Sequence, residues 1–322
     1  MRVFVSTVPF GANTDRCARL LADRNCEVVI NPLNRKLSAN ELEDFIEDFD
    51  YLIAGTEQIT SRALKRAKKL KLIARVGIGL DGIALITARE MGIAITYTPD
   101  APTEAVTDLT IALMGNLTRG VNLSDSLMRR GEWRRVYGKG LSDTKIGLIG
   151  FGRIGTGVYR KLVAMGASDI LINDIDSNVF KGLEISHQVS LSELLRDAEL
   201  ISIHTPLTNL TRNMISYTEL AVIRDGGFLV NTSRGGIVNE TALADSLKSG
   251  KLGGAAVDVF ETEPYIGPLC GIPNTILTAH MGSMTFACRD RMEFEATMEV
   301  CRHLDGESLL NPVPTSEIAD QL

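Results

Sequence analysis

Three polar residues stand directly after short apolar runs in the second half of the chain, where strand ends would expose them. Arg234 follows residues 228–233, Glu263 follows 257–262 and His280 follows 275–279. An arginine holds a carboxylate with two hydrogen bonds, and a histidine exchanges protons near neutral pH. A carboxylate beside that histidine would orient the ring. Singly they read as a surface cation, a turn residue and a packed histidine, but together they could reduce a 2-oxo acid.

A glycine-rich turn precedes these residues. Its letters are Gly150, Phe151, Gly152, Arg153, Ile154 and Gly155, between an apolar run at 145–149 and a helical pattern at 156–165. In such a turn the first glycine makes the bend, the second lets the backbone approach a pyrophosphate, and the third lets the helix pack against the strand. The pyrophosphate would then lie on the helix N-terminus. The pattern predicts a dinucleotide-binding βαβ unit.

An acidic residue completes this unit. Asp174 stands 19 residues after Gly155, at the end of a second apolar run at 169–173. It is predicted to accept hydrogen bonds from the ribose hydroxyls and to repel a 2′-phosphate, which favours NAD over NADP. Asp176 lies close enough to be an alternative for this role.

The elements that must position these groups alternate along the whole chain. Strands are predicted at 2–6, 27–30, 51–55, 72–76 and 93–97, then at 145–150, 169–174, 199–203, 227–231, 254–258 and 275–279. Helical patterns lie between the strands, a long helix is predicted at 103–130, and another at 286–304 could return to the first domain. This alternation predicts an α/β fold of two Rossmann-like or flavodoxin-like doubly wound parallel-sheet domains, with ligands in a cleft between them. The expected division is 1–99 plus 285–322 for substrate binding and 100–284 for NAD.

Bulk properties narrow the class of protein. A net charge of −6 argues against a nucleic-acid or anionic-membrane partner, and 44% hydrophobic with 23% charged residues is ordinary for a globular protein. The five cysteines are scattered without paired spacing, so we expect reduced thiols and no metal site. The N-terminus lacks the apolar region of a signal peptide and no run could span a bilayer, which predicts a cytoplasmic protein.

Six ordered segments resemble the D-isomer-specific 2-hydroxyacid dehydrogenase family across nearly the whole chain. They are residues 75–81 (RVGIGLD), 150–155, 204–208 (HTPLT), 231–236 (NTSRGG), 258–264 (DVFETEP) and 278–280 (TAH). The resemblance implies Arg234 as the substrate-binding arginine, His280 as the general acid/base and Glu263 as the acid partner of that histidine. It also implies a homodimer with the helix after residue 103 at the interface.

The same resemblance implies further contacts. The Val76 and Gly77 amides would cradle the substrate carboxylate, and Arg75 could serve a distal phosphate or pair with a local acid. The cofactor would be lined by His204 (through its backbone), Thr205, Pro206, Thr211, Thr232 and Asp258. The only tryptophan, Trp133, is either a packing anchor or part of a region that approaches the active site in the family.

Two positions depart from the family pattern. Gly82 replaces the usual asparagine after Asp81, so any contact of that amide is lost. Ala279 replaces the usual proline before the histidine, which removes a rigid φ. Neither change removes an ionisable group, so activity is still expected.

The sequence therefore predicts an NAD-dependent oxidoreductase that interconverts a D-2-hydroxy acid and a 2-oxo acid. Residues 97–103 resemble both phosphoglycerate dehydrogenases and glyoxylate/hydroxypyruvate reductases, with a slight preference for a phosphoglycerate-like substrate. Two other classes stay open. An NADH-sensing corepressor-type binding protein would bind without turnover, and a phosphite or formate dehydrogenase would use a similar scaffold.

Overall fold

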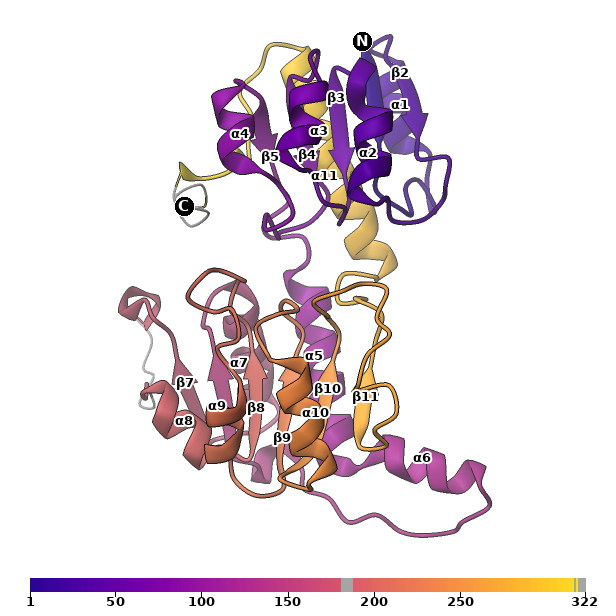
Figure 1. Ribbon diagram of the computed structural model, residues 1–322. Helices are drawn as coiled ribbons and strands as arrows, with labels where there is room; N and C mark the ends of the chain where they lie inside the picture. The colour runs from indigo at the N-terminus through magenta and orange to yellow at the C-terminus, as the bar shows by residue number, and fades with distance from the viewer. Residues whose placement is uncertain (181–187, 316, 318–322) are drawn as a thin grey trace. The chain divides into compact units, whose positions relative to one another are not determined.

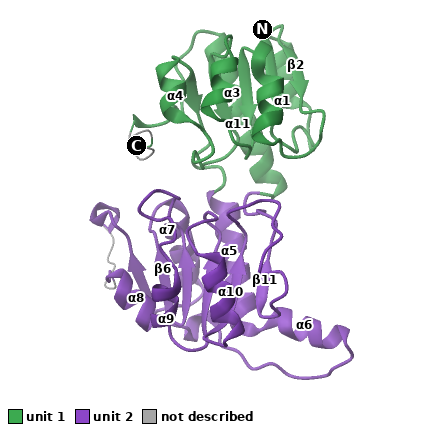
Figure 2. Cartoon of the chain, viewed as in Figure 1, with its two compact units in different colours: residues 1–102, 284–322 green, residues 103–283 purple. Residues whose placement is uncertain are grey.

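The computed structural model describes residues 1–180, 188–315 and 317. The chain divides into two compact units, coloured separately in Figure 2. Unit 1 comprises Met1–Pro102 and Met284–Leu322, and unit 2 comprises Thr103–Ser283. The element labels are those of Figure 1.

Unit 1 is built on a five-stranded parallel sheet with the strand order β2-β1-β3-β4-β5. Its strands are β1 (Arg2–Val5), β2 (Glu27–Ile30), β3 (Tyr51–Ala54), β4 (Leu72–Arg75) and β5 (Ala94–Thr96). The three central strands are almost entirely buried, as expected for a parallel sheet covered on both faces. This is the flavodoxin-like order, whose ligand-binding edge is at the carboxyl ends of the strands.

Helices cover both faces of this sheet. They are α1 (Arg16–Ala22), α2 (Ala39–Phe45), α3 (Ser61–Arg66), α4 (Leu85–Glu90) and α11 (Phe286–Leu304), with a 3₁₀ turn η1 (Ile46–Asp48). Helices α2, α3 and α4 contribute to one apolar cluster, while α1 packs on α11 and α11 contacts β3 and β4. Local signals begin these helices: Ser38 and Glu41 form a capping box on α2, and Thr285 caps α11.

Unit 2 contains a six-stranded parallel sheet with the order β11-β10-β9-β8-β6-β7. Its strands are β6 (Ile146–Ile149), β7 (Ile170–Asn173), β8 (Leu200–Ile203), β9 (Gly227–Asn231), β10 (Leu252–Val257) and β11 (Thr275–Leu277). The chain runs from β6 out to β7 and then back to β8 on the other side. This reversal makes the edge beside β6 and β8 the topological switch point, where doubly wound sheets bind ligands.

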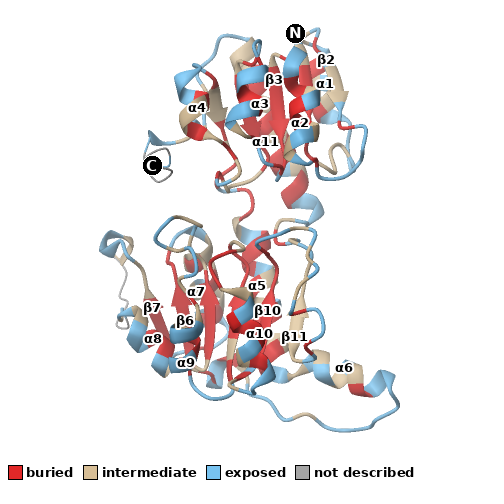
Figure 3. Cartoon of the chain, in the orientation of Figure 1, coloured by how far each residue is buried: buried red, intermediate tan, exposed pale blue. Residues whose placement is uncertain are grey.

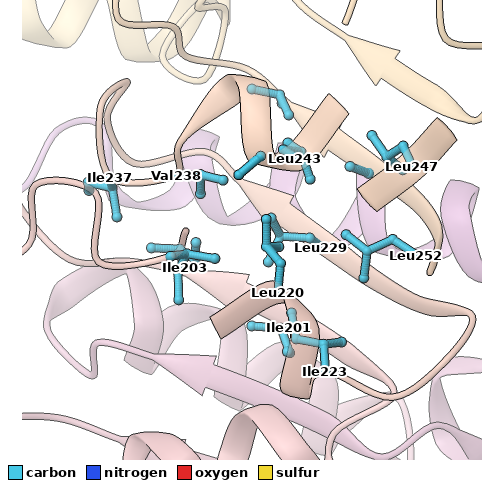
Figure 4. Close-up of a cluster of buried hydrophobic side chains, with 14 of the residues drawn as sticks. Ile201, Ile203, Leu220, Ile223, Leu229, Ile237, Val238, Leu243, Leu247 and Leu252 are labelled. Atoms are coloured by element: carbon cyan, nitrogen blue, oxygen red, sulfur yellow. The ribbon is translucent and has the colours of Figure 1, made fainter. Parts of the chain in front are cut away.

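Two apolar clusters sandwich this sheet. Its helices are α5 (Thr103–Arg119), α6 (Val121–Arg129), α7 (Arg153–Ala164), α8 (Leu191–Asp197), α9 (Tyr217–Val222) and α10 (Glu240–Lys248), with 3₁₀ turns η2 (Leu141–Asp143) and η3 (Ser177–Phe180). Helices α5 and α7 pack on one face. Helices α8, α9 and α10 pack on the other, where Leu220, Leu229 and Leu243 meet in the cluster of Figure 4.

The predicted fold class is confirmed, since each unit holds a parallel sheet with helices on both faces. One predicted element is wrong: the helix expected over 103–130 is two helices, α5 and α6. They separate at Gly120, which has a φ of 60° in the left-handed region. Glycine adopts this conformation without the steric penalty of a side chain, so it ends α5 where the apolar pattern alone continues.

Candidate active site

The glycine turn between β6 and α7 has a different constraint at each glycine. Gly150 has a φ of 93°, and a Cβ there would lie 2.7 Å from the backbone of His204. A Cβ on Gly155 would lie 2.1 Å from the Gly150 carbonyl oxygen, so only glycine lets α7 pack this close. At Gly152 no described atom lies within 4 Å of such a Cβ. The turn therefore leaves an open approach at the N-terminus of α7, which fits a pyrophosphate.

Asp174 lies beside this turn at the end of β7. Its carboxylate accepts hydrogen bonds from the backbone N–H of Phe151 at 2.6 Å and from that of Asp176 at 2.9 Å. Asp176, the alternative acid, is exposed and accepts from the Asn178 N–H. Asp174 is thus the acid that the fold holds against the glycine turn, with its charge at the edge where an adenosine ribose would lie.

The loop after β8 contacts the glycine turn on its other side. Both ring nitrogens of His204 and the Thr205 hydroxyl are buried and have no hydrogen-bond partner within the described part of the chain. Burial lowers the pKa of His204 to about 3, so the ring is neutral. Farther along, Thr211 accepts from the Thr208 N–H at 2.8 Å and donates to the Pro206 carbonyl at 2.6 Å. Unsatisfied polar atoms beside a glycine turn fit a bound dinucleotide.

Arg234 follows β9 in a loop that polar side chains organise. Buried Asn231 accepts from the Ser233 N–H at 3.1 Å and donates to the Arg234 carbonyl at 3.0 Å, while Arg234 donates to the Ser233 carbonyl at 2.7 Å. A Cβ on Gly235 would lie 2.0 Å from the Phe260 backbone, so this loop touches the one that carries Glu263. Thr232, a predicted cofactor residue, is buried and bonds Thr110 of α5 at 2.8 Å.

Glu263 and His280 are brought together from the ends of β10 and β11. Nδ1 of His280 lies 3.0 Å from both carboxylate oxygens of Glu263. The Phe260 N–H donates to the same carboxylate at 3.2 Å, which limits its rotation. Because Nδ1 faces the acid, Nε2 is the ring atom left to meet a substrate. This is the geometry of an oriented general acid/base.

Asp258, expected to line the cofactor, is directed toward the segment that carries His280. It is buried after β10, and its carboxylate accepts from the Thr278 hydroxyl at 2.6 Å, the Met281 N–H at 2.9 Å and the Gly282 N–H at 3.0 Å. These bonds hold the His280 segment. The predicted contact with a cofactor stays a prediction.

The predicted substrate loop of unit 1 follows β4. Arg75 is buried, and its guanidinium donates to the carbonyls of Ala54, Val76 and Gly79. The side chain thus shapes its own loop. The two amides expected to cradle a carboxylate already donate within the unit, Val76 N–H to Ala54 and Gly77 N–H to the Thr98 hydroxyl.

The next two amides in this loop differ. Among the described residues, the N–H groups of Ile78 and Gly79 donate no hydrogen bond. At the departure from the family pattern, a Cβ on Gly82 would lie 3.2 Å from the Glu57 carbonyl oxygen, so this position is crowded on one side. The predicted role of Val76 and Gly77 in binding a carboxylate stays a prediction.

Several other expectations have a direct structural outcome. All five cysteines are free thiols. Trp133 is 81% exposed, so it is not a packing anchor within its own chain. No helix in the described ranges is long and apolar enough to cross a membrane.

Two residues that organise the site begin motifs of the family resemblance, but the sequence assigned neither of them a role. Asn231 and Thr278 hold the loops of Arg234 and His280, respectively. Both are polar residues at the end of an apolar run, a pattern that signals a strand end yet does not reveal the partner on a neighbouring strand.

Comparisons with known proteins bear on this site. Residues 111–282 match the family described as D-isomer specific 2-hydroxyacid dehydrogenase, NAD binding domain. The chain is 34% identical over 291 residues to a D-3-phosphoglycerate dehydrogenase of Methanocaldococcus jannaschii, covering 88% of this chain and 55% of the relative. It thus spans about half the length of that enzyme. It is also 34% identical over 275 residues to a hydroxypyruvate reductase of Thermotoga maritima, covering 83% and 89% of the two chains. The solved structure of protein TT0316 from Thermus thermophilus superposes with a TM-score of 0.87 at 33% identity, covering 98% of this chain and 100% of that one.

Proposed function

This chain belongs to the D-isomer-specific 2-hydroxyacid dehydrogenase family, and from this premise we propose that it is an NAD-dependent oxidoreductase interconverting a D-2-hydroxy acid and a 2-oxo acid. One observation carries the proposal. The His280 ring is held by Glu263 at the carboxyl edge of the sheet whose first turn fits a dinucleotide. A general acid beside a dinucleotide site is what carbonyl reduction requires.

Each of the three ionisable residues has a distinct task in this reaction. Arg234 pairs with the substrate carboxylate and draws electron density from the adjacent carbonyl. His280 donates the proton on Nε2 to the carbonyl oxygen as that oxygen gains charge. Glu263 holds Nδ1 and stabilises the protonated ring before the transfer. In the oxidative direction His280 takes the same proton back.

The chain's own residues would hold the dinucleotide at the switch point of unit 2. The amides of Gly152, Arg153 and Ile154 at the N-terminus of α7 would hold the pyrophosphate, and Thr205 would offer a hydroxyl that has no hydrogen-bond partner among the described residues. When bound, the reduced nicotinamide supplies the hydride. Asp174 selects NAD over NADP because a second negative charge would stand against its carboxylate.

In unit 1, the loop after β4 is a proposed anion-binding element. The N–H groups of Ile78 and Gly79, which donate no hydrogen bond within the described ranges, support this role, and Val76 and Gly77 would join if their internal bonds were exchanged. Arg75 supports the loop from within, since its guanidinium already donates to two carbonyls of the loop, Val76 and Gly79, and to that of Ala54 at the end of β3. Because the guanidinium already donates to carbonyls within its own unit, these bonds argue against a phosphate contact by Arg75.

We propose a homodimer on the basis of an exposed apolar surface. Helix α6 and the segment after it, residues 121–137, expose Val121, Met128, Trp133 and Tyr137, the last two at 81% and 97%. Figure 3 shows α6 with little buried surface of its own. Contiguous exposed apolar groups mark protein interfaces. Light scattering behind size exclusion should give twice the 35.0 kDa chain mass, and a monomer would refute the proposal.

The reaction itself is tested by NADH oxidation at 340 nm. The substrates are phosphohydroxypyruvate, hydroxypyruvate, glyoxylate, pyruvate and longer 2-oxo acids, with NADPH in parallel. One strongly preferred 2-oxo acid with NADH supports the proposal and decides between a phosphorylated and an unphosphorylated substrate. His280→Ala is the negative control and should lose about 10²- to 10³-fold in kcat.

Binding without turnover would contradict the enzyme. If NADH quenches protein fluorescence but no acid is reduced, the NADH-sensing corepressor reading replaces the dehydrogenase. Oxidation of phosphite or formate by NAD, with no 2-oxo acid reduced, would keep the hydride chemistry and replace the substrate class.

A further inference from the structure

The segment that carries His280, residues 278–282, holds an uncommon backbone conformation. His280 has a φ of 49°, one of four positive values found at non-glycine residues in the described ranges. A side chain in this left-handed region is sparsely populated and persists only where its surroundings hold it. The His280 N–H donates to the carbonyls of Asp258 at 2.8 Å and Thr278 at 3.1 Å. These two bonds restrain the backbone of the histidine itself.

The residues before and after His280 are restrained by one buried carboxylate, that of Asp258. Asp258 takes one hydroxyl and two backbone N–H groups, from the residues before and after the histidine. A Cβ on Gly282 would lie 3.3 Å from the nearer carboxylate oxygen, so this residue is already in close contact with the acid. The carboxylate thus spans both flanks of His280 and is shielded from water, where such bonds are strong.

Ala279 leaves this segment without a covalent restraint on its backbone. Where the family usually has proline, alanine leaves φ free to rotate, and its N–H donates no hydrogen bond among the described residues. The ring of a proline would limit the segment covalently. Without it, the turn is held by hydrogen bonds, and the shortest that the segment makes to Asp258 comes from the Thr278 side chain.

We propose that Thr278 and Asp258 are a positioning pair that keeps His280 in its left-handed conformation, and that this pair replaces the restraint of the absent proline. The pair acts through His280, so its role in catalysis rests on the proposed function. Thr278 is the informative member, because it has no predicted contact with substrate or cofactor. A defect at Thr278 should therefore appear in the proton-transfer step and leave dinucleotide binding unchanged.

The test compares Thr278→Val, which has the same shape without a hydroxyl, with Thr278→Ser, which keeps the hydroxyl. Loss of a hydrogen bond to a buried charge should lower kcat about tenfold in Thr278→Val. NADH affinity, measured by fluorescence quenching, should stay within about twofold of the wild type in both variants. Thr278→Ser should keep kcat within about twofold. Thr278→Val with wild-type kcat would overturn the proposal, as would an equal loss in both variants.

A second variant asks whether proline can replace the pair. Adding Ala279→Pro to Thr278→Val should recover most of the lost kcat, because the pyrrolidine ring fixes φ of residue 279 and restricts the backbone of residue 278, the two residues that lead into His280. A merely structural defect would not be recovered in this way. If the double variant has no higher kcat than Thr278→Val, and both melt like the wild type, the inference that the pair takes the place of the proline is wrong.

Hydrogen exchange tests the pair without any assay of turnover. In the wild-type protein the Met281 and Gly282 amides should exchange more slowly than those of Ala279 and Ser283, which donate no hydrogen bond among the described residues. Thr278→Val should remove this difference. If no 2-oxo acid is reduced but Thr278→Val removes the slow exchange of the Met281 and Gly282 amides, the proposed function is wrong and the positioning pair is supported. Equal exchange of all four amides in the wild type overturns the pair even if Thr278→Val does not fold.

Discussion

Replacing Glu263 with glutamine should slow catalysis by a factor that the site geometry sets. Glu263→Gln keeps the side-chain shape and the acceptor for the Phe260 N–H, but it removes the charge opposite the His280 ring. Both carboxylate oxygens lie 3.0 Å from Nδ1, and the two side chains are 31% and 20% exposed. A hydrogen bond to a charged partner contributes about 1.5–3 kcal/mol. Since the pair is partly exposed, we take the lower half of that range, about 1.5–2 kcal/mol, which is roughly a 10- to 30-fold loss in kcat.

The matched control is Glu261→Gln, two residues earlier in the same loop. Glu261 pairs with Arg212 at 3.2 Å, and the two side chains are largely exposed. Such a pair contributes little, so kcat should stay within about twofold. Both variants would be assayed by NADH oxidation with the preferred 2-oxo acid at saturating concentrations. Equal rates for Glu263→Gln and Glu261→Gln would refute the assignment of Glu263 as the partner of His280.

Four further variants test the dinucleotide edge of unit 2. Gly155→Ala places a Cβ 2.1 Å from a carbonyl oxygen and should lower the free energy of unfolding by about 1–3 kcal/mol in a thermal melt. Gly152→Ala meets no described atom within 4 Å, so it should melt like the wild type while losing NADH affinity in a fluorescence titration; matching melts for the two variants would contradict this reading. Asp174→Ser should raise the ratio of kcat/KM for NADPH over NADH by about tenfold or more, because a like charge is removed, and an unchanged ratio would argue for another selector. Burial holds the pKa of His204 at about 3 against 6.5 when unfolded, so the unfolded chain binds this proton first and stability falls as pH drops from about 6.5 toward 3. Urea unfolding of the dinucleotide-free protein should show His204→Leu sparing about 2 kcal/mol of the loss between pH 8 and pH 5, and parallel losses would show that His204 titrates normally.

Much of the fold follows from local patterns. Each of the eleven strands in the described part of the chain has ends within two residues of an apolar run that predicts it, because buried parallel strands need short continuous hydrophobic segments. The capping boxes on α2 and α8 are equally local signals, set by residues three apart. The end of α5 is a limit of this reasoning, since the apolar pattern runs on through Gly120 and only the backbone conformation shows the break.

The candidate site divides in the same way. Motif order predicted Arg234, Glu263 and His280, and the structure places Glu263 against His280 and the Arg234 loop against the Glu263 loop. That neighbourhood could be expected because consecutive parallel strands end at one edge of a sheet. The individual hydrogen-bond partners could not be expected from the sequence, since they depend on contacts between residues that are distant in the chain.

The sequence by itself determined the two parallel-sheet units, the glycine turn and the chemical types of the candidate catalytic groups, because these rest on residue identity and short-range spacing. Only the tertiary structure decided which hydrogen bonds each group forms and how deeply it is buried. In this structure the Arg75 guanidinium bonds carbonyls of its own loop, and the Asp258 carboxylate accepts hydrogen bonds from residues on both sides of His280. Burial lowers the pKa of His204, so its ring is neutral. The physical reason is that hydrogen-bond partners and desolvation belong to the packed neighbourhood of a residue, which strands and loops far apart in the chain build together.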